Sequence, residues 1–291
     1  MKRIYTLLVL FLSGFAGAWA QNPIVVSEDQ IDIGNSTVPG YSVVIPEVSY
    51  ETIRKNWIKQ LESGTRSKVV EDDDKLSIFG AKIEPVSQNP VNVYSFLKDQ
   101  DGYVNLRVAM ELDHDKYAGS EEYANARRYL FDFAKEEYMA IVNEQLNEEQ
   151  KKLRSLKNDL SSAENDKSRM ERSSKSDAEI IEEERGRLAE LRKDLTSLSE
   201  EQYQGDSATV TGMGAVSPDE VKDLEKERKK LNREIKSSEE KIQKADEELK
   251  ENERSMPGTD NKIESLKGQV EDQEKVVAFF EKKLDTIKSY K

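Results

Sequence analysis

The stretch that decides the fold is Leu153–Leu198, which reads LRSLKNDLSSAENDKSRMERSSKSDAEIIEEERGRLAELRKDLTSL. Two stripes of residues recur in it at every seventh position, and the second stripe follows the first by three residues. The first consists of Leu153, Leu160, Lys167, Ser174, Ile181, Leu188 and Leu195, and the second of Leu156, Ala163, Met170, Asp177, Glu184, Leu191 and Leu198. Mostly apolar positions three and four residues apart, separated by Glu, Lys and Arg, are typical of coiled-coil helices.

The same pattern returns after a glycine-rich interruption and continues to the end of the chain. Its stripes are Val221, Arg228, Ile235, Ile242, Leu249, Met256, Ile263, Val270, Val277 and Leu284, with Leu224, Leu231, Ser238, Ala245, Asn252, Leu266, Gln273, Phe280 and Ile287 beside them. The interruption, Gly205–Val216, reads GDSATVTGMGAV, and Ser217-Pro218-Asp219-Glu220 has the cap and first-turn residues of a new helix. We therefore expect residues 119–291 to form an antiparallel coiled-coil hairpin with its tip near 204–217 and its turn at about residue 210.

The second helical segment contains a helix breaker. Pro257 followed by Gly258 predicts a break near 255–260, because proline removes a backbone donor and clashes with the preceding turn. The seven-residue step continues across the break, which favours an in-line kink over a fold-back into a three-helix bundle. Pro257 would face about residue 163, where the opposite segment is rich in serine. Pro257 and Gly258 are therefore hinge candidates, with local fraying as the alternative.

The first 20 residues have the features of a secretory leader. Lys2 and Arg3 precede the apolar run Ile4–Phe15, and Ala18-Trp19-Ala20 fits a cleavage site. The apolar run is shorter than a bilayer span, so we expect cleavage after Ala20 and no stable membrane insertion afterwards. The leader predicts an exported, periplasmic or extracellular protein.

Residues 21–39 read as a polar linker, and residues 40–118 alternate between strand and helix patterns. A strand is expected at Tyr41–Ile45, and a helix that Ser49 caps and Gly64 ends should bury Ile53, Trp57 and Leu61. Further strand candidates are Ser67–Val70, Leu76–Ile83, Val91–Leu97 and Tyr103–Leu112, and Asp101-Gly102 between the last two is a strong hairpin signal. The fold class is thus a small α+β head followed by a long helical hairpin.

Charge excludes some partners. The whole chain carries a formal net charge of −13, and loss of Lys2 and Arg3 would leave 43 basic against 58 acidic residues, a net −15. Nucleic acids and anionic membranes attract the opposite balance. The chain has no cysteine, which excludes disulfides, thiolate catalysis and Cys-based metal sites. We expect protein partners, which could include envelope proteins or a second copy of the chain, since buried polar residues in a coiled coil select partners and alignment.

The sequence contains no recognisable catalytic or cofactor-binding constellation. The lone His114 lies between Asp113 and Asp115, and strand alternation would place both acids on the opposite face from it, so a solvated histidine is favoured over a metal ligand. The acidic run Glu71–Asp74 fits an exposed turn better than a calcium site. We predict no enzyme, no metal and no cofactor.

Two functions fit this organisation. The first is an exported scaffold or adaptor whose head and hairpin contact different proteins, with Val210, Met213 and Val216 at the tip as contact candidates. The hairpin loosely resembles those of periplasmic adaptor proteins. The alternative is a periplasmic holdase, because a head with helical arms resembles the jellyfish-shaped chaperone of outer-membrane proteins; that resemblance implies binding of unfolded membrane proteins.

Overall fold

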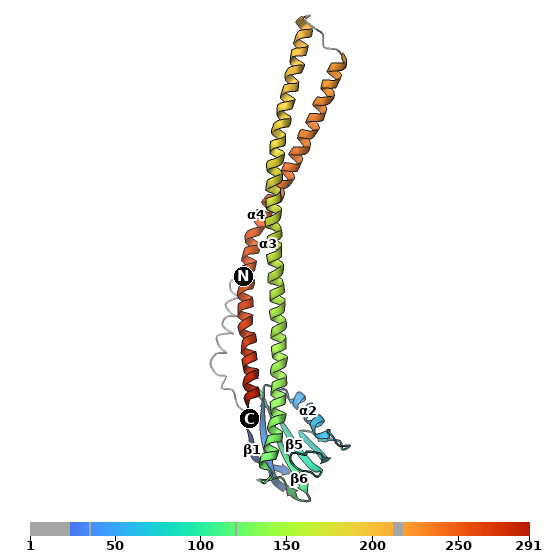
Figure 1. Ribbon diagram of the computed structural model, residues 1–291. Helices are drawn as coiled ribbons and strands as arrows, with labels where there is room; N and C mark the ends of the chain where they lie inside the picture. Colours follow the sequence, from blue (N-terminus) through green and yellow to red (C-terminus); the bar gives the residue numbers. More distant parts are fainter. Residues whose placement is uncertain (1–23, 35, 120, 212–217) are drawn as a thin grey trace. The chain divides into compact units, whose positions relative to one another are not determined.

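The computed structural model describes residues 24–34, 36–119, 121–211 and 218–291 (Figure 1). The predicted leader, Asn35, Ser120 and residues 212–217 lie outside these ranges. The elements in chain order are β1 (Val26–Ile33), β2 (Ser36–Pro46), α2 (Tyr50–Glu62), β3 (Val70–Asp72), β4 (Lys75–Ala81), β5 (Val91–Gln100), β6 (Tyr103–Asp113), β7 (Lys116–Tyr117), α3 (Tyr123–Thr211) and α4 (Pro218–Ser289). The predicted fold class is confirmed: an antiparallel sheet with a short helix precedes two long helices that pair as a hairpin.

The chain forms two compact units. One contains the residues up to Lys151 together with Lys275–Lys291, and we call it the head unit. The other, Lys152–Glu274, consists of helix alone, and we call it the arm unit. The head unit therefore includes the first turns of α3 and the last turns of α4. No helix in the described ranges combines the length and the apolar character needed to cross a bilayer.

The sheet of the head unit is antiparallel throughout, in the order β1-β2-β6-β5-β4-β3, with β7 also paired to β6. The predicted hairpin between β5 and β6 is present, and Gly102 at its turn has φ +86°, which glycine adopts without strain. The predicted strand at Ser67–Val70 is displaced to β3, because Lys68 and the amide of Val69 bond to Glu62 at the end of α2.

The prediction of a linker at residues 21–39 is wrong. Val26–Ile33 is strand β1, and it pairs along its whole length with β2, which begins at Ser36. The sequence pattern hid this strand because most of its side chains are polar and exposed, as an edge position permits. The head therefore begins at Val26, 14 residues before the predicted start at residue 40.

One face of the sheet carries the main core of the head. The predicted helix α2 is confirmed, with Ser49 accepting a hydrogen bond from the amide of Thr52 at 3.2 Å. Its buried residues are Ile53, Trp57 and Leu61, as expected. The indole nitrogen of Trp57 donates to Ser95 Oγ on β5 at 2.8 Å, which satisfies both buried polar groups.

A smaller core lies on the opposite face of the sheet. It is formed by Ile31, Val38 and Ala109, with Ile33, Tyr94, Phe96 and Tyr117 packed against it. Gly40 makes this packing possible, since a Cβ there would collide with Ile31 Cδ1 and lie 2.8 Å from the carbonyl oxygen of Val108. The part of β2 that precedes Tyr41 does not pair with β6, and β7 pairs with the corresponding end of β6 instead. The β1–β2 hairpin thus departs from the main sheet at Gly40.

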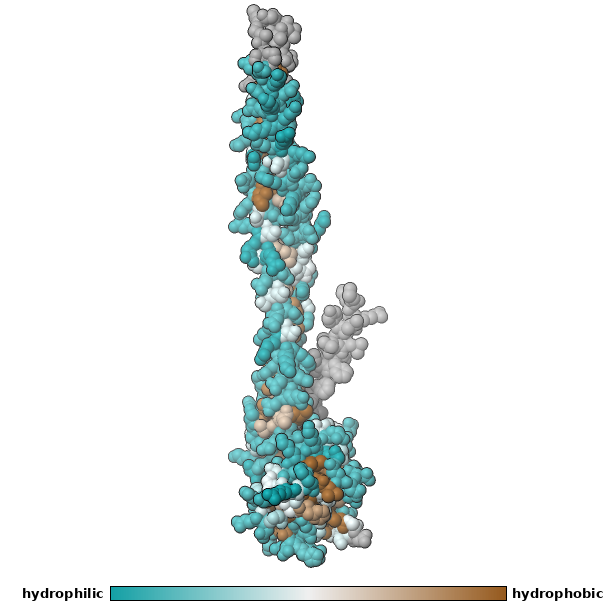
Figure 2. Space-filling model, turned by 90° about the vertical axis from the view of Figure 1, so that its right-hand side faces the viewer, coloured by the Kyte–Doolittle hydropathy of each residue, from teal (hydrophilic) through white to brown (hydrophobic). Residues whose placement is uncertain are grey.

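In the arm unit α3 and α4 pack along the predicted stripes. Every buried residue among the described residues of this unit belongs to them: Ala163, Asp177, Ile181, Glu184, Leu188, Leu191, Ser238, Ala245, Ile263 and Leu266. Ion pairs that join the two helices flank this seam, among them Lys157–Glu274, Lys167–Asp260 and Arg192–Glu239. On the face shown in Figure 2 most of the arm is hydrophilic, with small apolar patches, and the larger apolar areas belong to the head unit.

Several predicted boundaries of the hairpin need correction. Helix α3 starts at Tyr123, where the carboxylate of Glu122 accepts a hydrogen bond from the amide of Gly119 and the carbonyl of Glu122 accepts from Ala126. Gly205 does not end α3, which continues to Thr211, so only residues 212–217 remain for the turn. Because the turn lies later, the pairing is shifted: Lys167 bonds to Asp260 at 2.6 Å, which places Pro257 level with about residue 170, not 163.

The predicted break near 255–260 does not interrupt the second long helix. Pro257 lies inside α4, which continues in line as one helix from Pro218 to Ser289, so the favoured in-line course holds and the fold-back into a three-helix bundle is wrong. The seam keeps its partners on both sides of the proline, with Ala245 buried before it and Ile263 and Leu266 packed on Ala163 after it. Tertiary packing of the stripe therefore outweighs the local cost of proline in a helix.

Candidate interaction site

The first turns of α3 are bound to the sheet by aromatic side chains. Trp57 of α2 packs against Phe133 and Tyr129 of α3, with ring centroids 4.8 and 6.0 Å apart. The hydroxyl of Tyr41 donates to the carbonyl of Gly119 at 2.9 Å, and its ring lies 5.8 Å from that of Tyr123. The large residues that open α3 thus dock on α2 and on β2 of the sheet.

The last turns of α4 are held to the head by a buried ion pair. Lys283 Nζ donates to both carboxylate oxygens of Glu47, at 2.6 and 2.7 Å, and its side chain is only 4% exposed. The hydroxyl of Tyr138 on α3 donates to the same carboxylate at 3.1 Å, and burial followed by the charge of Glu47 raises the pKa of Tyr138. Lys283 also lies over the rings of Tyr138 and Phe280.

The backbone supports the same pair. Glu47, in the β2–α2 loop, has φ +59°, a conformation that a residue with a Cβ rarely adopts, and its amide donates to the carbonyl of Gly102 at 2.9 Å. Lys135 of α3 donates to the carbonyls of Lys288 and Tyr290, at 2.8 and 2.7 Å, where the dipole of α4 favours a cation. The two helices and the sheet are therefore cross-linked at this junction, which we call the Glu47–Lys283 junction.

A groove of about 650 Å³ runs between α2 and the first turns of α3. Its α2 wall carries Lys55 and Lys59, and its α3 wall carries Glu136 and Glu137. Burial raises the pKa of Glu137, although Asn56 Nδ2 donates to its carboxylate at 2.7 Å. The α2 wall also carries Glu62, whose carboxylate accepts hydrogen bonds from Lys68 and the amide of Val69, so the groove is lined by both acidic and basic side chains.

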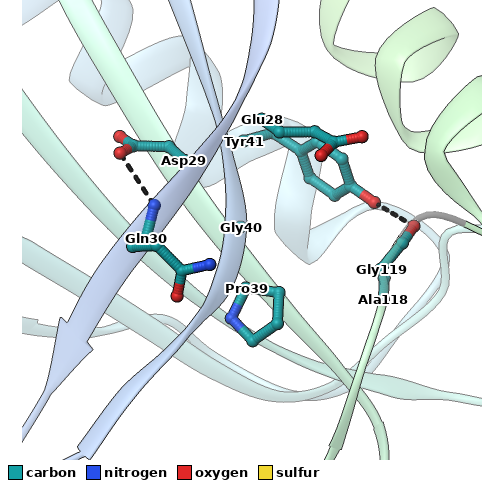
Figure 3. A pocket seen from close by; sticks show the side chains of 8 residues that line it. All are labelled: Glu28, Asp29, Gln30, Pro39, Gly40, Tyr41, Ala118 and Gly119. Carbon is teal, nitrogen blue, oxygen red and sulfur yellow. Dashed lines mark hydrogen bonds between the residues drawn. The ribbon is translucent and has the colours of Figure 1, made fainter.

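A second cavity, of about 580 Å³, lies where β2 departs from β6 (Figure 3). Its lining residues are Glu28, Asp29, Gln30, Pro39, Gly40, Tyr41, Ala118 and Gly119. Burial and the charge of Glu122 raise the pKa of Tyr41 to about 12, so its phenol stays protonated and donates to Gly119. Asp29 accepts a hydrogen bond from the amide of Gln30 and another from Arg107. Asp29, Gln30 and Tyr41 of this cavity thus already have hydrogen-bond partners, two of these bonds coming from Arg107.

The surroundings of His114 differ from the prediction. Strand β6 ends at Asp113, so alternation does not extend to Asp115, and His114 Nε2 lies 3.5 Å from the Asp115 carboxylate. These two residues and Glu111 bring one ligand atom each within 4.8 Å of one another. However, Glu111 already accepts hydrogen bonds from Asn92, Tyr94 and the amide of Asp115. The side chains of His114 and Asp115 are 93% and 85% exposed, which favours a turn held by Glu111 over a metal site.

The acidic run Glu71–Asp74 forms the β3–β4 turn, with Asp73 at φ +50°. Glu71 pairs with Arg54, and Asp74 Oδ1 accepts a hydrogen bond from the Tyr50 hydroxyl at 3.5 Å. These carboxylates therefore bind partners on α2 and do not converge on a common point, as the turn interpretation requires.

The predicted contact and hinge residues fall in two places. Val210 belongs to the last turn of α3, but its side chain lies outside the described part of the chain. Met213 and Val216 lie wholly outside the described residues. Pro257 and Gly258 lie inside α4, and a Cβ on Gly258 would meet no atom within 4 Å. The contact role of the tip and the hinge role of Pro257 remain predictions.

Sequence reasoning missed the residues that join the head to the helices. Glu47 and Lys283 are 236 positions apart, and Asp29 and Arg107 are 78 apart, so no local spacing indicates either pair. The chain matches none of the protein-family models, and no curated protein matches it in sequence. Function is therefore inferred from the head unit and the arm unit themselves.

Proposed function

We propose that this chain is an exported, non-enzymatic adaptor that contacts one protein through its head unit and another through its arm unit. The main support is that the first turns of α3 and the last turns of α4 belong to the same compact unit as the sheet. A helical pair whose two ends are fixed in a folded head, by the Glu47–Lys283 junction among other contacts, suits a protein that presents its helices to a partner.

The composition of the arm unit supports a presenting role. Its buried residues are those of the seam, so its outward faces are polar and serve neither a core nor a second layer of helices within the described chain. About 60 residues of α3 belong to this unit, which at 1.5 Å per residue gives roughly 90 Å of helix. A helical pair of this length that buries only its seam is typical of proteins that bind partners along or at the end of a coiled coil.

Export is part of the proposal and rests on the leader at residues 1–20. If it is correct, the envelope or secreted fraction contains a chain that begins at Gln21, as mass spectrometry of the intact protein would show. A chain that retains Met1–Ala20 in the cytoplasm would contradict export without affecting the adaptor role.

The adaptor role is tested by site-specific photo-crosslinking in the native host. A crosslinking amino acid at Val210 should capture a partner protein that the same residue at Lys193, exposed on α3 farther from the turn, does not capture. Identical crosslinks at both positions, or none, would contradict a partner contact at the turn. In addition, the purified protein should give no protection to an unfolded outer-membrane protein at equimolar dose; protection would favour the holdase alternative.

A further inference from the structure

We propose that Asp29 and Arg107 close the outer edge of β1 against pairing with a β1 strand from a second copy of the chain. Strand β1 is the first strand of the sheet, and no other described strand pairs with its outer side. Its eight residues have no proline and no bulge against β2, which are two of the means by which proteins protect an exposed edge. An edge of this length needs another form of protection.

The direction of the backbone groups on β1 follows from its partner strand. Gln30 is opposite Pro39, and proline has no amide hydrogen, so these residues cannot exchange the two hydrogen bonds of a narrow antiparallel pair. The backbone amide and carbonyl of Gln30 therefore point away from β2, toward the outer edge. Figure 3 shows this amide directed at the carboxylate of Asp29.

Both of these outward groups are occupied by side chains. The amide of Gln30 donates to Asp29 Oδ1 at 2.8 Å, and the carbonyl of Gln30 accepts from Arg107 Nη2 at 2.7 Å. Arg107 Nε in turn donates to Asp29 Oδ2 at 2.6 Å, so the three groups form a closed arrangement. An incoming strand would have to displace an ion pair in order to reach the backbone of Gln30.

The other end of the edge is also occupied. The carbonyl of Val26, which has the same outward direction as that of Gln30 because four residues separate them, accepts a hydrogen bond from the Tyr123 hydroxyl at 3.4 Å. Arg107 comes from β6, two strands away, and reaches β1 across Gly40 and Ser42 of β2, which present little side chain there. The opposite edge of the sheet, β3, is only three residues long and needs less protection.

The excluded partner is a second copy of β1, since identical edges are always present at equal concentration in a solution of this chain. The test compares Arg107→Met with Arg66→Met, an exposed position on the same unit that loses the same charge. Sedimentation velocity over a range of concentrations should show self-association about tenfold stronger for Arg107→Met than for Arg66→Met. Equal association of the two variants would overturn the proposal.

A second substitution identifies the surface that associates. The amide of Glu28 points outward, two residues from that of Gln30, so Glu28→Pro removes a donor from the edge without breaking the β1–β2 ladder. The double variant Glu28→Pro/Arg107→Met should return to the association of Arg66→Met, whereas persistent association would contradict pairing through β1. In the unsubstituted protein the amide hydrogen of Gln30 should exchange about tenfold more slowly than that of Glu28, and equal rates would also overturn the proposal.

Discussion

Replacing Lys283 by Met tests the junction that fixes α4 to the head. The change removes the charge but keeps an unbranched apolar chain of similar length, so it isolates the ion pair with Glu47. Removal of one partner of a fully buried pair typically costs about 3–5 kcal/mol. Glu47 is 26% exposed and keeps its hydrogen bond from Tyr138, so its charge stays partly solvated, and we expect a loss of about 2 kcal/mol.

Urea denaturation monitored by tryptophan fluorescence measures this loss. Trp57 is the only tryptophan in a chain that begins at Gln21, and it is fully buried against Phe133, so its emission reports unfolding of the head unit. Lys282→Met is the matched control, because Lys282 is the exposed neighbour on the same helix. The double substitution with Glu47→Gln should cost less than the sum of the two single losses.

The result that would refute this reasoning is a Lys283→Met variant within about 0.5 kcal/mol of Lys282→Met. That outcome would mean that the cost of desolvating the two charges offsets the attraction between Glu47 and Lys283, and that apolar contacts alone hold α4 to the head.

Three further predictions concern the head and the hairpin. Gly40→Ala should lower the free energy of unfolding by about 1–3 kcal/mol in the same denaturation assay, because its new Cβ lies 2.8 Å from the carbonyl oxygen of Val108 and collides with Ile31. The hydrogen bond from Arg107 lowers the pKa of Asp29 below 3.8. The ionised carboxylate therefore stabilises the folded state above pH 3.8, and this stabilisation is lost as the pH falls through the folded pKa. Asp29→Asn should reduce the dependence of the unfolding free energy on pH in this acidic range. In a chain without cysteine, a short thiol-specific crosslinker that replaces the reach of the lysine side chain should join Lys167→Cys/Asp260→Cys, as electrophoresis of the treated protein would show.

Each of these has a control in the chain. Gly119→Ala should be nearly neutral, since a Cβ there meets no atom within 4 Å, and a loss equal to that of Gly40→Ala would contradict the steric explanation. A pH dependence of unfolding that Asp29→Asn leaves unchanged would argue against the Arg107 bond. Leu160→Cys/Asp260→Cys corresponds to a turn at residue 210 and should react with the same crosslinker more slowly; faster crosslinking of this pair than of Lys167→Cys/Asp260→Cys would refute the register described above.

The seam of the hairpin could be predicted from the sequence because its cause is local. Residues such as Ile181, Leu188 and Ile263 recur at heptad spacing, and a helix places every such residue on one side whatever the rest of the chain does. The turn was placed too early for a related reason: Gly205 weakens a helix by only about 1 kcal/mol, which the flanking residues of a long helix outweigh.

The head was harder to predict where it depends on contacts distant in sequence. The hydrophobic alternation of β5 and β6 marks buried strands, but β1 is mostly polar because it lies at an edge, and nothing in its composition separates it from a linker. Glu47 is one of 58 acidic residues, and only the fold places it beside Lys283. The junction that the functional proposal depends on was therefore invisible to pattern analysis.

The most direct test of the adaptor proposal replaces the arm unit, Lys152–Glu274, by a short glycine–serine loop and compares the partners that this variant and the full chain capture in the native host. The head unit should remain folded, with the fluorescence of buried Trp57 unchanged, and should keep the partner of the head while losing at least one partner of the arm. An identical set of captured proteins for the two chains would contradict the adaptor function.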